Sequence, residues 1–261
     1  MKLFKNILLR ILGEKNYLFF FAYMFQRLYK TGKLGLEYQD VYFLKHIIRN
    51  GDYVVDIGAH LGYYTFELSR LTGQDGRVIA IEPVSKFNRV IGKMISKYKF
   101  SKNISLQKVA LGGSGKFVEI GIPIVGKEKK FGYARIKELS QHLDYAESEK
   151  VPNVDGDELF AGLIRLDFIT CDVEGAEVPV FKSLLATIAR HAPILLCELA
   201  DKQERIRMFE LLKPWNYKSY LLKNGILLEL DVFSDNLAIS HNHYFIPPER
   251  IGYLKNFIHI S

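Results

Sequence analysis

Cysteine is scarce in this chain of 261 residues, which has only Cys171 and Cys197. Both fall in short apolar runs that we expect to be buried strands, so a disulfide framework is not indicated and a reducing cytosol is the expected compartment. Cysteine and histidine also lack the spacing of a zinc site. Apolar residues make up 48% of the chain and aromatic residues 13%, which is enough to build one sizeable hydrophobic core.

Long hydrophobic runs are missing as well. The most apolar N-terminal stretch, residues 17–25, is shorter than the about 20 residues that a membrane-spanning helix needs. Arg10 interrupts the apolar residues before it and no small-residue cleavage site follows, so a secretory signal is not expected. The sequence also has no internal repeat and no low-complexity segment. These absences favour a cytoplasmic protein.

Acidic residues are nearly absent from residues 1–35, where seven Lys or Arg and one Glu give a net charge of +6, against +7 for the whole chain. The rest of the chain is therefore near neutral, which argues against a nucleic-acid groove. Apolar residues recur at helical spacing from Leu3 to Leu12 within this basic segment. Two interpretations stay open: an amphipathic helix on an anionic membrane surface, at the inner face of the membrane, or a helical extension that packs on the body or on a second subunit of a homodimer. We divide the chain into this extension, residues 1–37, and one domain, residues 38–261.

The remaining sequence is organised around residues 52–83. Two short apolar runs rich in β-branched residues, 53–57 and 78–81, bracket one helical stretch and predict strands buried on both faces of a parallel sheet. The turn after the first run holds Gly58 and Gly62, which let a ligand approach the backbone in front of a helix N-terminus. This is the pattern of a βαβ unit with a ligand site at its first turn.

The residues of that turn favour S-adenosylmethionine over a dinucleotide. The glycine spacing differs from Gly-x-Gly-x-x-Gly, and Asp56 places a carboxylate where a pyrophosphate gains nothing from negative charge. A carboxylate suits the ammonium end of S-adenosylmethionine, and Glu82 is placed to accept both ribose hydroxyls. A buried loop without a ligand and a site for another nucleotide are the alternatives.

Four stretches together resemble the FkbM-type methyltransferases: residues 55–65 (VDIGAHLGYYT), Glu82-Pro83, residues 109–112 (VALG) and residues 167–177 (DFITCDVEGAE), the last being the most distinctive. The resemblance implies an α/β fold with the class I methyltransferase (Rossmann-like) sheet, doubly wound, mostly parallel and seven-stranded, behind an N-terminal helical extension. It also implies O-methylation of a hydroxyl, often on a sugar. His60 stands where the family commonly has asparagine. The expected cofactor-binding residues are Asp56, Gly58, His60, Gly62, Tyr63, Glu82, Pro83, Ala110 and Asp172.

The rest of the pattern supplies the other elements. Apolar runs predict strands over residues 104–109, 166–171, 194–197, 217–222, 226–230 and 243–246, with an Asn-Gly hairpin at residues 224–225 and a helix over 181–189. Between residues 112 and 152 the pattern weakens to one extra strand over 117–120. A connection as long as residues 121–150 is usually a lid, a binding loop or disordered, and we expect it to supply acceptor specificity.

Acidic residues follow the strands where the chemistry is expected. Neighbouring strand ends would bring Asp172 and Glu198 roughly 5 Å apart at the backbone. Methyl transfer to a hydroxyl gains from a general base, for which Asp172, Glu174 and His243 are the candidates. A hydrogen-bonded structural pair of His241 and His243 is the alternative for the histidines. An Mg²⁺ ion held by Asp172 and Glu198 stays open, although the interpretation without a metal is preferred.

The predicted function is S-adenosylmethionine-dependent O-methylation of a hydroxyl of a sugar or glycan, in polysaccharide biosynthesis. Methyl transfer to a small-molecule or lipid-linked acceptor is the first alternative. The second is a non-catalytic cofactor-binding protein whose N-terminal helices serve in an interaction. Asp56, Glu82 and Asp172 together disfavour this second alternative.

Overall fold

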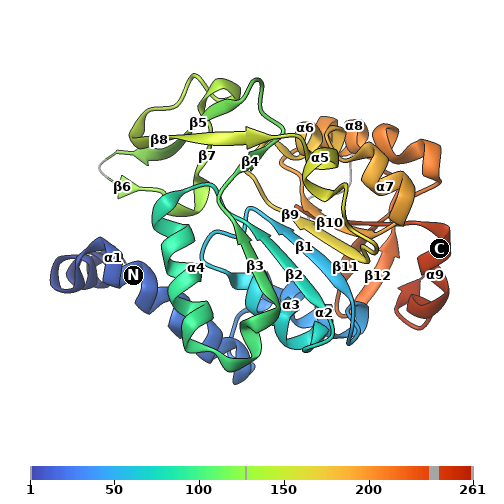
Figure 1. Ribbon diagram of the computed structural model, residues 1–261, viewed down its shortest axis with the longest axis horizontal. Coiled ribbons are helices and arrows are strands. Elements are labelled where there is room, and N and C mark those ends of the chain that lie inside the picture. The colour runs from blue at the N-terminus through green and yellow to red at the C-terminus, as the bar shows by residue number, and fades with distance from the viewer. Residues whose placement is uncertain (1, 127, 235–240, 260–261) are drawn as a thin grey trace.

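The computed structural model of the chain describes residues 2–126, 128–234 and 241–259. Its centre is a nine-stranded sheet in the order β14-β12-β11-β13-β10-β9-β1-β2-β3 (Figure 1). The strands from β3 to β10 are parallel, and β13 begins the antiparallel part. The strands are β1 (Tyr53–Ile57), β2 (Arg77–Ile81), β3 (Ile104–Gln107), β9 (Phe168–Cys171), β10 (Ile194–Glu198), β11 (Lys218–Lys223), β12 (Ile226–Glu229), β13 (Asn242–Ile246) and β14 (Ile258–His259).

This arrangement confirms the α/β, doubly wound and mostly parallel fold, with nine strands rather than seven. The hairpin expected at Asn224 and Gly225 joins β11 to β12, and both residues have positive φ, 52° and 79°. β14 adds a strand beyond β12. The sheet is built outward in both directions from β1 and β9, and open α/β sheets hold their ligands beyond the strand ends at such a point.

Helices cover both faces of the sheet because the strands turn alternate apolar side chains to each face. Val55 and Ile57 pack with α6, α7 and α8, whereas Val54 and Phe168 pack with α2 and α3. The helices are α2 (Gln39–Ile47), α3 (Tyr63–Thr72), α4 (Ser85–Lys97), α5 (Gly156–Phe160), α6 (Glu177–Lys182), α7 (Leu185–His191), α8 (Lys202–Leu212) and α9 (Pro248–Leu254), with 3-10 turns at Leu36–Tyr38, Lys99–Asn103 and Lys213–Trp215.

Several predicted boundaries differ from the structure, and two of these differences divide a predicted element. The single helix expected over residues 181–189 is two helices, because Leu184 leaves helical geometry (φ −120°, ψ 13°) between α6 and α7. The third strand ends at Gln107 instead of Val109, and Ala110 begins a separate strand.

The N-terminal extension forms α1 (Lys2–Lys30), which is interrupted at Gly13 (φ 68°, ψ 160°). Its second half packs on α4 and α3 and buries Leu18, Ala22 and Phe25. Gln26 donates to the carbonyl of Gly62 at 3.4 Å and so ties the helix to the turn after β1. Within the described part of the chain, no helix is long and apolar enough to span a membrane.

Residues 110–154, called the insertion below, differ from the irregular connection expected over residues 121–150. They form a second sheet in the order β4-β8-β5-β6, with β7 beside β5, above the large sheet in Figure 1. Val118, Ile120 and Ile122 are buried on β5, but β8 carries charges that hide its alternation. The strands are β4 (Ala110–Leu111), β5 (Phe117–Val125), β6 (Glu128–Lys129), β7 (Arg135–Ile136) and β8 (Tyr145–Val154), with 3-10 turns at Phe131–Tyr133 and Lys137–Leu139.

Candidate active site

A cavity of about 920 Å³ lies beyond the carboxyl ends of β1, β2 and β9. Three parts of the chain enclose it: these strand ends, α1 and the insertion. Most of the predicted cofactor residues line it: Asp56, Gly58, His60, Tyr63, Glu82, Pro83, Ala110 and Asp172. Tyr17, Phe20, Phe21 and Met24 of α1 also line it, although no role in the site was predicted for them. Residues 128–136 of the insertion line it as well, and they belong to the connection that was expected to supply acceptor specificity.

The glycine turn brings β1 against β9. Gly58 has φ +83°, and a Cβ on it would lie 1.8 Å from the carbonyl oxygen of Asp172. A side chain at this position would therefore push the ends of the two strands apart. Gly62 has φ +81° and precedes α3 behind the cavity wall. Its carbonyl accepts the hydrogen bond from the Gln26 side chain of α1.

Asp56 is buried at the end of β1 and accepts a hydrogen bond from the Thr65 hydroxyl of α3. Burial raises the pKa of Asp56 to about 6, and the hydrogen bond from Thr65 opposes this rise. The carboxyl group is thus fixed in place at the cofactor end of the cavity.

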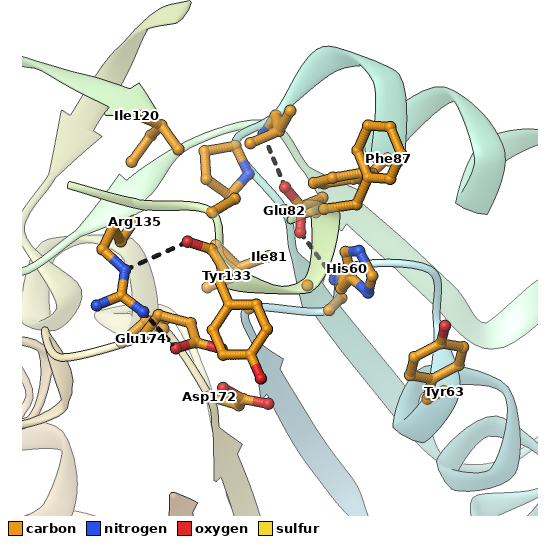
Figure 2. A pocket seen from close by; sticks show the side chains of 18 of the residues that line it. His60, Tyr63, Ile81, Glu82, Phe87, Ile120, Tyr133, Arg135, Asp172 and Glu174 are labelled. Atoms are coloured by element: carbon orange, nitrogen blue, oxygen red, sulfur yellow. Dashed lines mark hydrogen bonds and ion pairs between the residues drawn. The ribbon is translucent and has the colours of Figure 1, made fainter. Parts of the chain in front are cut away.

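Glu82 is held by two backbone amides. The N–H of His60 donates to Oε2 and the N–H of Val84 donates to Oε1, both at 2.7 Å (Figure 2). Burial raises the pKa of Glu82 to about 8 against these two hydrogen bonds. Each carboxylate oxygen has a further lone pair, so this group can accept the two hydroxyls of a ribose as well.

His60 occupies a strained and apolar position. Its φ is 48°, and its ring lies 4.4 Å from that of Phe87 and 5.7 Å from that of Tyr63. Burial lowers the pKa of His60 to about 4, so the imidazole is neutral, and its buried Nε2 has no hydrogen-bond partner among the described residues. An orphaned polar atom of this kind fits a site that is completed by a ligand.

Carboxylates gather at the other end of the cavity. Cys171 and Cys197 are partners in the β9–β10 register, and this places the next residues, Asp172 and Glu198, side by side as predicted. Asp172 is exposed, but it is exposed to the cavity, and the cavity walls surround its side chain. Burial and the neighbouring Glu198, to which it is hydrogen-bonded, raise the pKa of Asp172 well above its usual range.

The insertion adds a cation and a phenol to this end. Arg135 forms an ion pair with Glu174 at 2.7 Å, and its Nε donates to the carbonyl of Tyr133 at 3.2 Å (Figure 2). In the same view the Tyr133 hydroxyl points toward Asp172. Burial raises the pKa of Glu174 to about 7 although Arg135 opposes the rise. Glu174 also has a positive φ of 58°, a backbone strain of the kind found at functional sites.

The structure separates one of the three candidates for catalysis, His243, from the other two. Asp172 and Glu174 line the cavity, but His243 is not among the described residues that do so. It lies on β13 opposite Cys197, where burial lowers the pKa of the imidazole to about 3. The nearby His241 has Nδ1 at 3.3 Å from the carbonyl of Leu199.

The described residues contain no group of three or more His, Cys, Asp or Glu side chains arranged to hold a metal ion. Asp172 and Glu198 alone would leave most of the coordination of an Mg²⁺ ion to water and acceptor.

The chain is similar to several known proteins. The family described as the methyltransferase FkbM domain matches residues 56–222. The chain is 12% identical to a SAM-dependent O-methyltransferase from Thermotoga maritima, with a TM-score of 0.44 over 79% of this chain and 63% of that one. It is 18% identical to the methyltransferase FkbM from Methylobacillus flagellatus KT, with a TM-score of 0.46 over 74% of this chain and 43% of that one. Fibrillarin from Aeropyrum pernix, in complex with natively bound S-adenosyl-L-methionine, is 13% identical, with a TM-score of 0.42 over 80% and 74%.

The chain thus spans less than two thirds of the length of the first two of these proteins. No curated protein sequence matches it.

Proposed function

Because the chain belongs to the FkbM methyltransferase family, with S-adenosylmethionine as its cofactor, we propose that it methylates a hydroxyl of a sugar or glycan in polysaccharide biosynthesis. The observation that carries this proposal is Asp172, a carboxyl group that opens into the cavity and has a strongly raised pKa. The bound cofactor supplies an electrophilic methyl group, and an acceptor hydroxyl must lose its proton as it attacks.

The cofactor end of the cavity fits S-adenosylmethionine through residues of this chain. Glu82 would accept the ribose hydroxyls, and Asp56 would face the ammonium end directly or through water. The neutral imidazole of His60 has its unpartnered Nε2 available for a polar group of the ligand. Gly58 keeps the backbone of the turn free of side-chain atoms beside them.

Asp172 is the proposed general base. It is hydrogen-bonded to Glu198, and its ionised form would accept the proton of the acceptor hydroxyl. Its raised pKa makes the ionised form of Asp172 a stronger base than that of an ordinary aspartate. Glu174 is the second candidate, but its ion pair with Arg135 favours a role in positioning.

A polyhydroxylated acceptor suits the groups around Asp172. Glu174 accepts hydrogen bonds, Arg135 donates them, and the Tyr133 hydroxyl does both. All three line the cavity, which at about 920 Å³ is near the upper end of the usual range for ligand pockets. A small-molecule acceptor or a lipid-linked one would use the same groups, and a non-catalytic cofactor-binding protein would not need the base.

Transfer of an isotope-labelled methyl group tests the proposal. The purified chain, the labelled cofactor and polysaccharide fractions are incubated, and mass spectrometry locates the label on a sugar oxygen. Asp172→Asn should lower kcat by about 10²–10⁴-fold with little change in cofactor affinity. The matched control is Asp144→Asn, an exposed acid of the insertion that does not line the cavity. Label found on nitrogen or carbon, or an Asp172→Asn variant as active as the control, would refute the proposal.

A further inference from the structure

The outer face of α1 carries apolar side chains that the fold leaves uncovered. Phe20, Phe21 and Leu28 are 39%, 45% and 37% exposed, although the opposite face of the helix is buried against the body. Ile7 and Ile11, in the first half of the helix, are exposed as well. Exposed apolar side chains gathered along one helix mark a binding surface more often than isolated ones do.

Cations border this apolar face. Arg27 is exposed on α1, and the neighbouring α4 contributes Lys93 and Lys97, which are also exposed. Their ammonium groups lie over two rings of α1, Lys93 at 3.9 Å from the centroid of Phe19 and Lys97 at 4.6 Å from that of Tyr23. The positive edge therefore runs along the same helix as the exposed apolar side chains.

The acidic residue of α1 does not offset this charge. Glu14 pairs with Lys86 of α4 and with Lys129 of the insertion, the latter at 3.0 Å. Its charge is thus already matched within the body of the protein, and the cations at the outer face remain in excess.

We propose that this face of α1, with the adjoining edge of α4, docks on an anionic phospholipid bilayer and that the methyl acceptor is linked to a lipid of that bilayer. Apolar side chains flanked by cations are the features by which interfacial helices bind such surfaces. Phe20 and Phe21 are exposed and also line the cavity, so docking would place one wall of the cavity at the membrane. The statement about the acceptor rests on the proposed function, whereas the docking does not.

A second copy of the chain is the competing occupant of this face. A symmetric dimer brings the same patch of both subunits together, and Arg27, Lys93 and Lys97 would then lie near their own counterparts. Such like-charge contact is unfavourable, whereas an anionic surface complements these cations.

Vesicle flotation of the full chain tests the docking. The wild type should float with vesicles containing about one-third phosphatidylglycerol at low salt. It should be released in about 1 M salt, where the Debye length is about 3 Å. Each cation near such a surface is worth about fivefold in affinity, so the triple variant Arg27→Glu/Lys93→Glu/Lys97→Glu should bind at least about 100-fold more weakly. Circular dichroism verifies that it is folded.

The matched control is Lys182→Glu/Lys213→Glu/Lys255→Glu, which changes the net charge equally at exposed sites in α6 and directly after α8 and α9. These helices lie across the large sheet from α1 in Figure 1. It should float almost like the wild type. Leu28→Ser/Ile11→Ser is a second variant that should weaken flotation without changing the charge. The docking is wrong if the wild type does not float, if both triple variants lose affinity equally, or if ultracentrifugation shows a dimer that only the Arg27 triple variant disrupts.

A separate measurement addresses the acceptor. Labelled methyl transfer into a lipid-extractable glycan supports the second half of the proposal, and transfer into water-soluble glycans alone refutes it. Flotation without methyl transfer to any acceptor would instead count against the proposed function and leave the docking intact.

Discussion

At the residue scale, the backbone fixes the cofactor end of the cavity. The amides of His60 and Val84 orient both oxygens of Glu82 before any ligand is bound. His60 orients Glu82 through its backbone N–H, which any residue except proline could supply, while its ring packs on Phe87 and keeps Nε2 unpartnered among the described residues. A carboxylate held in this way loses little freedom when it accepts a ligand, and such preorganisation favours affinity.

Replacement of Glu82 by Ala tests this arrangement. Titration calorimetry with S-adenosylmethionine should show at least about a tenfold loss of affinity, about 1.4 kcal/mol, because the ribose hydroxyls lose their acceptor. Glu119→Ala, at a partly exposed acid of the insertion, should bind normally. Unchanged affinity in Glu82→Ala would disprove the ribose assignment.

At the element scale, the parallel strands β1, β2, β9 and β10 could be predicted because each is a short apolar run that is mostly buried. The insertion could not, because its polar strand β8 is stabilised by partners distant in sequence. Glu147 and Glu149 of β8 pair with Lys86 and Lys108 at 2.6 and 3.0 Å. Without knowledge of those partners, the many charged residues of β8 make its sequence look like that of a loop.

The same limit applies to the site. Asp56, Glu82 and Asp172 follow strands at one edge of the sheet, so strand order alone brings them together. Tyr133 reaches the cavity from a 3-10 turn of the insertion and Arg135 from β7, and no periodic pattern in the sequence connects them with β9. The only hint for Arg135 in the sequence is the apolar residue that follows it, which is a weak indication of a strand. Nothing in the sequence indicates that Arg135 pairs with Glu174, 39 residues later.

The Arg135–Glu174 ion pair links the insertion to the end of β9, and we expect it to position the acceptor. Arg135→Ala should lower kcat/KM for the acceptor by roughly 10-fold or more, since a misplaced acceptor loses the benefit of orientation, while cofactor affinity stays unchanged. Arg135→Lys should restore part of the loss, because lysine keeps the charge but not the planar fork. Lys137→Ala, at a neighbouring cation that pairs with Glu119, is the control. If Arg135→Ala changes only the affinity for the cofactor, Arg135 does not position the acceptor.

At the scale of the whole molecule, the two ends of the sheet carry different polar networks. The carboxyl end holds the cavity and its acids. At the amino end Asp167 pairs with Arg165 at 2.6 Å and with Arg250 of α9 at 3.1 Å, and it accepts the N–H of Tyr53 at 3.0 Å. Asp167 begins the most distinctive motif of the sequence, but it stabilises the fold at the end opposite the site.

Asp167→Ala should therefore reduce stability without changing the cavity. Loss of a buried carboxylate that holds Arg250 and the Tyr53 amide should lower the free energy of unfolding by about 2–4 kcal/mol, less any part that the half-exposed Arg165 recovers from water. Urea denaturation measures this loss, and cofactor affinity well below the melting temperature should match that of the wild type. A stable variant with weakened cofactor binding would contradict this division between the two ends.

The acids at the carboxyl end also set how stability depends on pH. Burial raises the pKa of Glu82 to about 8 and those of Glu174 and Glu177 to about 7, above the about 4.3 of a glutamate in the unfolded chain. Below the unfolded pKa of about 4.3 these carboxyl groups are protonated in both the folded and the unfolded state. The stability that their protonated forms contribute to the folded state is then fully present. As pH rises toward 8 the folded state holds protons that the unfolded state has lost, so the free energy of unfolding falls.

The window in which this decline can be measured is set by the histidines. Burial lowers the pKa of His60 to about 4 and that of His243 to about 3, so these groups make stability rise with pH up to the unfolded value of about 6.5. From about pH 6.5 to 8 the protonated fraction of these imidazoles in the unfolded chain falls from about one half to almost none, so the acids come to determine the slope. The melting temperature of the ligand-free protein should fall across this range, and Glu82→Gln should flatten the fall above about pH 7, whereas Glu119→Gln should not. Hydroxyl donors from bound S-adenosylmethionine would stabilise the ionised form of Glu82, so the cofactor should flatten the fall in the wild type too. A melting temperature that rises from about pH 6.5 to 8 in the ligand-free wild type would show that these carboxyl groups are not buried as the structure has them.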